Sequence, residues 1–223
     1  MPKLKILCLH GLAENAIYMR KKTEFMMRSV EDMVDLVYIN GPYLVLPAEH
    51  NSTDVQYKHG DGIEDNSIAS LSYSYWNPRR YDPMVLANKS VDPNQKTWDL
   101  LRKVLIEQGP FDGILGFSQG GALAAILSIL LAGQDVIPNP LGPDTVHPPL
   151  RFTIIIGSMM PMTKSGFAGL FMQPTKAETP SMHIMGELDT IVGMKAMEHL
   201  ASRFKNPVLI RHPGGPIHIS PTT

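Results

Sequence analysis

The pentapeptide Gly116-Phe117-Ser118-Gln119-Gly120 constrains the fold more than any other part of the chain. It follows an apolar run from Phe111 to Leu115 and opens a helical run from Gly121 to Ala132. A serine between two glycines at a strand-to-helix turn is typical of a nucleophile elbow, which exposes the hydroxyl and needs small neighbours. We therefore predict a strand, a sharp turn and a helix, with Ser118 as a candidate nucleophile. The alternative is a serine that only makes a tight turn.

Apolar runs alternate with amphipathic helical patterns along the rest of the chain. Strands are expected at residues 4–9, 35–39, 152–156, 182–185 and 208–210, and helices at 17–30, 93–108 and 193–204. Asp92 is expected to cap the second of these helices, with Pro93 at its first position. The strand at 152–156 is expected to be buried on both faces. Such alternation predicts an α/β fold with a mostly parallel central sheet flanked by helices on both faces.

The chain of 223 residues is expected to form one domain spanning residues 1–223, because α/β folds of this length commonly hold a single core. Three segments interrupt the alternation and are predicted to be loop insertions, at about 43–90, 136–150 and 158–180. Long irregular stretches inside a compact domain are usually functional.

Charge and composition exclude several classes of partner. Twenty basic residues stand against 21 acidic ones, which leaves no electrostatic footprint for nucleic acid or an anionic membrane. Cys8 is the only cysteine and cannot form an internal disulfide, which suits a reducing compartment. The apolar runs are too short for a signal sequence or a membrane span. We predict a cytoplasmic protein without nucleic-acid or membrane partners, and the oligomeric state stays open.

Chemically capable side chains follow four of the expected strands. They occur in the segment 10–15, at Ser118, in the segment 186–189 and in the segment 212–218. The carboxyl ends of parallel strands meet at one edge of a sheet, where functional groups gather. Serine, then aspartate, then histidine is the order of the catalytic groups along α/β-hydrolase chains.

These residue types predict an acyl-transfer site. Ser118 would attack a carbonyl, His218 would accept its proton and pass it to the leaving group, and Asp189 would orient and stabilise the imidazole. The backbone N–H groups of Leu12 and Gln119 would bind the developing oxyanion. This chemistry requires neither a metal nor a cofactor.

Other residues remain open as alternatives for these roles. Glu187 is the alternative acid and His212 the alternative base. His10 is expected to shape the loop after the first strand, because its side chain shares space with the oxyanion site. His183 alternates within a strand and is expected in the core.

Apolar residues after the strand at 152–156 suggest a wall for an acyl chain. Met159, Met160 and Phe171 are the predicted members, and Trp76 is the predicted opposite wall. Methionine adapts to irregular ligands, and apolar side chains line most ligand clefts. The alternatives are ordinary core packing for the methionines and an anchoring role for the tryptophan.

Five motifs together resemble the FSH-type family of small serine hydrolases: Leu9 to Gly11, Gly109 to Gly113, Gly116 to Gly121, Gly186 to Asp189 and His212 to Gly215. That family includes yeast serine hydrolases, the ovarian-cancer-associated esterase and fungal thioesterases that release polyketide chains. The likeness runs from about Lys3 to Pro221. It implies an α/β-hydrolase fold acting on acyl esters or thioesters.

We therefore expect a serine hydrolase that forms an acyl-enzyme on Ser118 and transfers the acyl group to water. The fungal branch of the family suggests release of a polyketide or fatty acyl chain from an acyl carrier protein. A small-ester carboxylesterase and a lactone-forming acyltransferase are alternatives. A non-catalytic binding module is the alternative from another class, because Pro216 and Ile217 separate the paired glycines from His218, where the family's histidine follows directly.

Overall fold

The computed structural model describes residues 2–45, 71–77, 92, 94–133, 139–142, 144–161 and 176–215. The strands are β1 (Leu4–Leu9), β2 (Val34–Ile39), β3 (Tyr43–Leu44), β4 (Tyr73–Ser74), β5 (Gly113–Phe117), β6 (Phe152–Ile156), β7 (Ser181–Gly186) and β8 (Val208–His212). The helices are α1 (Ala16–Arg28), α3 (Gln95–Gln108), α4 (Gln119–Leu131) and α6 (Met194–Ala201).

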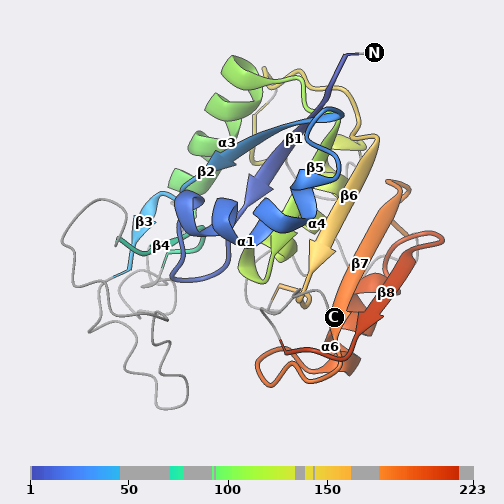
Figure 1. Cartoon of the computed structure of the whole chain (residues 1–223). Helices are drawn as coiled ribbons and strands as arrows, with labels where there is room; N and C mark the ends of the chain where they lie inside the picture. The colour runs from blue at the N-terminus through green and yellow to red at the C-terminus, as the bar shows by residue number, and fades with distance from the viewer. Residues whose placement is uncertain are drawn as a thin grey trace.

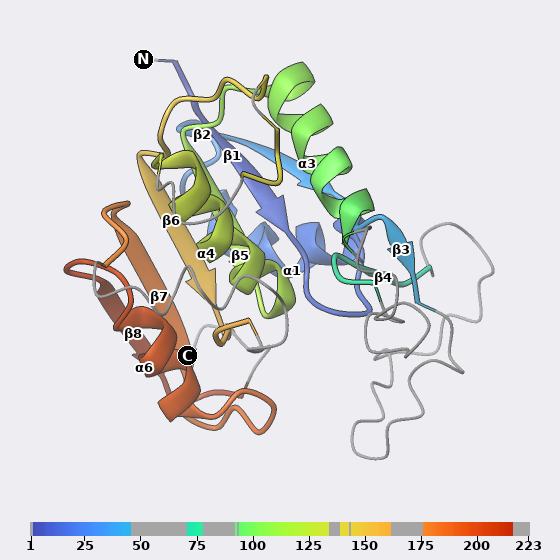
Figure 2. The same ribbon diagram turned by 180° about the vertical axis from the view of Figure 1, so that it is seen from behind.

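Six strands form one sheet in the order β2-β1-β5-β6-β7-β8 (Figure 1). Every neighbouring pair in this sheet is parallel. Helix α1 covers one face, whereas α3, α4 and α6 lie on the other (Figures 1 and 2). The predicted parallel sheet with helices on both faces is confirmed.

The core is centred on β5 and α4. All five residues of β5 are buried, and α4 is buried from its first turn to its last. A helix that is apolar on every side must lie inside the protein. The main core cluster joins α4 to α3 through Trp98, Leu101 and Leu105. This packing fixes the position of the turn that connects β5 to α4.

A short antiparallel pair lies beside the main sheet. Tyr43 pairs with Ser74, and Leu44 pairs with Tyr73. Glu14 also forms a bridge with Tyr73, so the segment 71–77 adjoins the loop after β1. The sequence patterns did not indicate this pairing, because each partner is only two residues long. Of the three predicted insertions, residues 46–70, 78–90, 136–138, 143 and 162–175 lie outside the described part of the chain.

Two expectations about local structure require correction. Helix α3 begins at Gln95 with Asn94 as its N-cap, later than the predicted start. Asp92 instead accepts a hydrogen bond from the Asn94 N–H and one from the Trp98 indole N–H, both at 2.8 Å, so its carboxylate anchors the segment before the helix. Pro93 lies outside the described residues. Strand β6 alternates between buried and half-buried positions, because no described helix covers its second face.

No helix in the described ranges combines the length and the apolar character needed to cross a membrane.

Candidate active site

Ser118 occupies the turn between β5 and α4 with φ 49° and ψ −114°. Non-glycine residues seldom adopt this region, and such strain persists where surrounding contacts hold it. The Ser118 N–H donates to the Ile156 carbonyl at 2.9 Å. Its carbonyl accepts from the N–H groups of Gly121 and Ala122 and from the Ser158 hydroxyl at 2.8 Å. The main chain of the serine is therefore held on both sides.

The glycines around Ser118 allow the close approach of three segments. A Cβ atom on Gly116 would lie 2.3 Å from the Gly120 carbonyl oxygen. A Cβ atom on Gly120 would lie 2.3 Å from the Leu9 carbonyl oxygen, and one on Gly121 would lie 2.7 Å from the Ser158 Cβ. Real Cβ atoms do not approach that closely, so the first turn of α4 packs against the ends of β1 and β5 only with glycine at these positions.

In the loop after β1, the N–H of Leu12 finds no acceptor within the described ranges, whereas its neighbours do. The Gly11 N–H donates to the Glu14 carboxylate at 3.0 Å, and the Ala13 N–H donates to the Tyr73 carbonyl at 3.0 Å. Between them, the Leu12 N–H has no acceptor among the residues that the structure describes. The two peptide groups beside Leu12 are thus fixed, which limits the directions in which its N–H points.

Gln119 begins α4, and its side chain is tied to the segment 71–77. Its Oε1 accepts from the Tyr75 N–H at 2.7 Å and from the Ser74 hydroxyl at 3.2 Å. Its backbone N–H is at the helix N-terminus, where N–H groups lack intrahelical acceptors and favour negative charge. Segment 71–77 therefore contacts the loop after β1 and the start of α4, the two parts of the chain that carry the predicted oxyanion donors.

His10 is a structural residue of the loop, as the sequence predicted. The Gly41 N–H donates to its Nε2 at 2.9 Å. Its Nδ1 therefore carries the proton and donates to the Gly11 carbonyl at 2.6 Å. Its ring packs on Tyr75 with the centroids 4.6 Å apart. Burial lowers the pKa of His10 to about 4, so the ring is neutral near pH 7. Both of its nitrogens form hydrogen bonds that stabilise the loop.

The second buried histidine lies away from Ser118. His183 is 3.2 Å from the Ser181 hydroxyl and packs edge-on against Phe204. Burial lowers the pKa of His183 to about 4, which agrees with the predicted core position. Within the described ranges, no group of three or more His, Cys, Asp or Glu side chains is arranged to hold a metal ion.

Asp189 follows β7, and its two carboxylate oxygens have different surroundings. Its Oδ1 accepts from the N–H groups of Ile191 and Val192, both at 2.8 Å. Its Oδ2 is buried and has no hydrogen-bond donor in the part of the chain that the structure describes. Glu187, the alternative acid, is exposed. A buried oxygen of this kind is normally satisfied, so the geometry leaves Asp189 one acceptor for a further group.

The end of β8 passes next to the turn that carries Asp189. The Leu188 N–H donates to the Gly214 carbonyl at 3.2 Å. His212, the alternative base, accepts from the Gly214 N–H through Nδ1 at 3.2 Å. The described residues include no hydrogen bond between His212 and Asp189. His218, the predicted base, lies outside the described residues.

The predicted substrate residues occupy different environments. Trp76 is only 9% exposed and packs near Trp98 in the main core, a placement that favours the anchoring alternative. Met160 is half-buried against the same core, whereas Met159 is 44% exposed. Phe171 lies outside the described residues.

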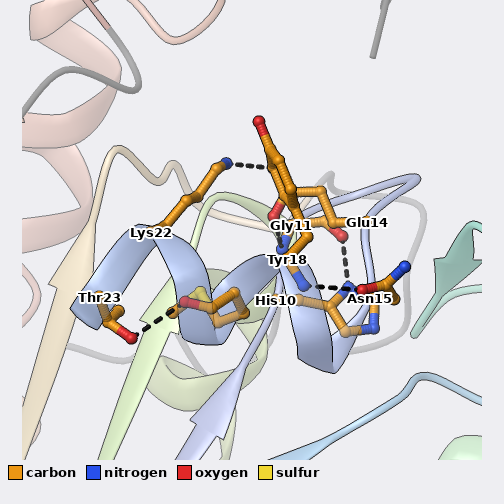
Figure 3. Close-up of polar contacts among 8 residues, drawn as sticks. His10, Gly11, Glu14, Asn15, Tyr18, Lys22 and Thr23 are labelled. Carbon is orange, nitrogen blue, oxygen red and sulfur yellow. Dashed lines mark hydrogen bonds and ion pairs between the residues drawn. The ribbon is translucent and has the colours of Figure 1, made fainter. Parts of the chain in front are cut away.

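Sequence reasoning missed a buried ion pair beside the oxyanion loop. Lys22 of α1 pairs with the Glu14 carboxylate that holds the Gly11 N–H (Figure 3). The Lys22 ammonium also lies over the Phe117 ring, 3.9 Å from its centroid. Glu14 and Lys22 are eight positions apart and Glu14 precedes α1, so no i,i+3 or i,i+4 spacing within a helix indicated the pair. The one indication in the sequence was the position of Glu14 in the segment 10–15, which follows the first expected strand.

Comparisons with known proteins point to one family. The family model described as Serine hydrolase (FSH1) matches residues 1–223. A Xenopus tropicalis protein named Esterase OVCA2 is 31% identical over 216 residues, which cover 95% of this chain and 84% of that protein. A Schizosaccharomyces pombe protein named Uncharacterized hydrolase C22A12.06c is 30% identical over 212 residues, covering 95% of this chain but only 46% of its own length.

Solved structures agree on the fold. The crystal structure of Zea mays acyl-protein thioesterase 2 aligns with a TM-score of 0.61 and 16% sequence identity, covering 98% of this chain and 88% of that one. At this identity the likeness concerns the fold alone, and it confirms the predicted α/β-hydrolase architecture. The match to the family model confirms the resemblance and the prediction of a hydrolytic enzyme. The chain belongs to the FSH1 family of serine hydrolases.

Proposed function

We propose that this protein is an esterase or thioesterase that forms an acyl-enzyme on Ser118. The observation that carries the proposal is the strained serine at the start of α4, with φ 49°, beside a loop whose Leu12 N–H lacks an acceptor in the described part. Strained residues at such turns are typical of activated nucleophiles. The name of the frog relative, an esterase, supports ester hydrolysis.

The reaction follows the order of acyl transfer. The Ser118 oxygen forms a bond to the substrate carbonyl carbon while His218 takes the hydroxyl proton. The N–H groups of Leu12 and Gln119 stabilise the negative oxygen. His218 returns the proton as the bond to the leaving alcohol or thiol breaks. Water then attacks the acyl-enzyme in the same way and releases the acid, with Asp189 stabilising the imidazolium throughout.

Local geometry supports His218 as the partner of Asp189. The chain runs past the Asp189 turn at Leu188 and Gly214. His218 follows Gly215 by three positions, which an extended chain spans in about 10 Å. The Asp189 Oδ2, which has no hydrogen-bond donor among the described residues, could accept an imidazole N–H.

Exposed apolar side chains support an apolar acyl group. Leu12 follows β1, Met159 follows β6, and Leu188 and Ile191 follow β7; all four are exposed. They therefore lie at the carboxyl edge of the sheet, the edge that also carries Ser118. Apolar surface around a polar reaction centre is the usual composition of a ligand site.

Covalent labelling tests the nucleophile. A fluorophosphonate probe should add once to the intact protein, as measured by mass spectrometry, and Ser118→Ala should abolish the adduct. The same substitution should lower kcat for p-nitrophenyl butyrate by on the order of 10⁴, because the triad acts as a unit. An adduct that survives in Ser118→Ala would overturn the proposal.

A pair of histidine variants tests the base. His218→Ala should abolish both labelling and turnover, whereas His212→Ala should retain most of each. Asp189→Asn keeps the Oδ1 acceptor for Ile191 and Val192 but removes the charge, so kcat should fall by roughly 10⁴ with little loss of stability. Full activity in His218→Ala would instead identify His212 as the base.

A chain-length series tests the acyl group. Each methylene buried in the transition state contributes about 0.8 kcal/mol, so four of them raise kcat/KM by roughly a hundredfold. Met159→Ala should flatten the rise from acetyl to decanoyl p-nitrophenyl esters. The matched control is Met33→Ala, because Met33 is also exposed but precedes β2 at the opposite edge. A series that peaks at acetyl would favour the small-ester alternative.

We also propose a carrier-bound thioester as the physiological substrate class, following the fungal members of the family. The test compares hydrolysis of one acyl group presented as a coenzyme A thioester and on a phosphopantetheinylated carrier protein. A higher kcat/KM for the carrier form is expected. Equal rates would remove the carrier from the proposal, and a cyclic product from a hydroxyacyl substrate would favour lactone formation.

A further inference from the structure

A buried ion pair lies directly behind the loop that follows β1. The side chains of Glu14 and Lys22 are only 11% and 12% exposed. One carboxylate oxygen of Glu14 pairs with the Lys22 ammonium, and the other accepts the Gly11 N–H at 3.0 Å (Figure 3). A buried pair is rarely retained for stability alone, because the desolvation of both charges offsets their attraction. Its position beside the predicted oxyanion donor calls for another explanation.

The carboxylate controls one side of the Leu12 peptide. It holds the Gly11 N–H, while the Tyr73 carbonyl holds the Ala13 N–H on the other side. Ala13 adopts a positive φ of 57°, a conformation that needs such support. Space around Gly11 is also closed, since a Cβ there would lie 2.9 Å from the Phe117 ring. The direction of the Leu12 N–H therefore depends on the Glu14 side chain.

A carboxylate at this place creates an electrostatic conflict. An uncompensated negative charge near an oxyanion site disfavours the developing negative oxygen, and the interaction is strong where water is excluded. Lys22 resolves the conflict by neutralising Glu14. Its ammonium is held against the faces of the Phe117 and Tyr18 rings, at 3.9 and 4.7 Å from their centroids, so it is pre-organised for this contact.

Two other titratable residues that interact with the pair, both in the described part of the chain, carry no charge that could replace Lys22. His10 and Tyr75 interact electrostatically with the pair from the end of β1 and from the segment after β4. Burial lowers the pKa of His10 to about 4 and raises that of Tyr75 far above its ordinary value, so both are neutral near pH 7. Tyr18 contributes its ring from α1.

We propose that Glu14 is the positioning residue of the oxyanion hole and that Lys22 is the counter-ion that makes a carboxylate tolerable there. Glu14 fixes the peptide before Leu12, and Lys22 prevents its charge from opposing the transition state. This inference rests on the proposed function, in which the Leu12 N–H binds the oxyanion.

Two double variants test the positioning role of Glu14. Both lack the two charges of the pair and differ only in whether residue 14 can accept a hydrogen bond. Lys22→Met with Glu14→Gln leaves an amide oxygen to accept the Gly11 N–H. Lys22→Met with Glu14→Met removes that acceptor. The first should exceed the second in kcat for p-nitrophenyl butyrate by about tenfold, a fraction of the loss seen when an oxyanion donor is removed, with KM within about twofold. Equal kcat values in two folded proteins would overturn the positioning role.

The single variant Lys22→Met tests the counter-ion. It leaves the Glu14 carboxylate unpaired beside the oxyanion site, so kcat for p-nitrophenyl butyrate should fall by about tenfold or more while KM stays within about twofold. The double variant Lys22→Met with Glu14→Gln should restore kcat to within about threefold of wild type. A purely structural pair would change stability without this recovery of kcat. A wild-type kcat in Lys22→Met would overturn the counter-ion role.

The control is Arg28→Met on the same helix. Arg28 forms an exposed pair with Glu24 at 3.2 Å, and exposed pairs contribute little, so kcat should be unchanged. Ser118→Ala separates the two proposals. Activity that persists in Ser118→Ala refutes the proposed function itself, whereas Ser118-dependent activity that ignores Glu14 and Lys22 refutes only this inference. Thermal melts of each variant exclude unfolding as the cause.

Discussion

Mild acid is expected to destabilise this protein through the buried histidines His10 and His183. Burial lowers the pKa of His10 and His183 to about 4 in the folded chain, below the ordinary value of about 6.5 that applies when the chain unfolds. Between these two values the unfolded chain binds protons that the folded chain does not. The free energy of unfolding therefore falls as the pH drops from about 6.5 to about 4.

The size of the effect follows from the two pKa values. For each histidine, lowering the pH from about 7 to about 5 removes roughly 2 kcal/mol of stability. In the neutral ring, His10 Nε2 accepts the Gly41 N–H at 2.9 Å. Protonation turns Nε2 into a donor and breaks this hydrogen bond. Two histidines together remove about 4 kcal/mol, a large share of the 5 to 15 kcal/mol typical of a domain.

Urea unfolding at several pH values between 7 and 5 measures this dependence. His183→Leu should reduce the stability difference between the two ends of that range by about 2 kcal/mol. His10→Gln should reduce it by a similar amount. His199→Gln removes a histidine from the exposed surface of α6 and is the matched control. If neither buried substitution flattens the pH dependence relative to this control, the reasoning from burial is refuted.

Three further predictions concern the turn at Ser118. Gly116→Ala should lower the free energy of unfolding by about 2 kcal/mol, because the added Cβ would lie 2.3 Å from the Gly120 carbonyl oxygen; a melting temperature equal to wild type would contradict the contact. Ser118→Gly should be more stable than Ser118→Ala by about 1 kcal/mol, since glycine relieves the positive φ, and calorimetry of the two inactive variants compares them directly. Gln119→Leu should cost about 1 to 3 kcal/mol in urea unfolding, because it leaves the buried Tyr75 N–H without its acceptor; no loss would mean that another group accepts that N–H.

Local patterns in the sequence were sufficient for the central elements. The apolar run before Gly116 and the helical run after Gly120 each extend over several residues, and their periods differ clearly. The strands and helices found in the structure match the predicted ones to within a few residues at most ends. At the start of α3, Asp92 binds the Trp98 indole instead of capping the helix, and α3 begins two residues later than predicted.

The sequence by itself determined the alternation of strands and helices and the glycines that the Ser118 turn requires, because these depend on neighbours along the chain. Only the tertiary structure decided that the segment 71–77 joins the loop after β1 to the start of α4, and that Trp76 lies in the core. It alone decided that Lys22 meets Glu14. These contacts depend on how α1 and a two-stranded ribbon pack on the sheet, and side-chain partners set by packing leave no periodic signal in the sequence.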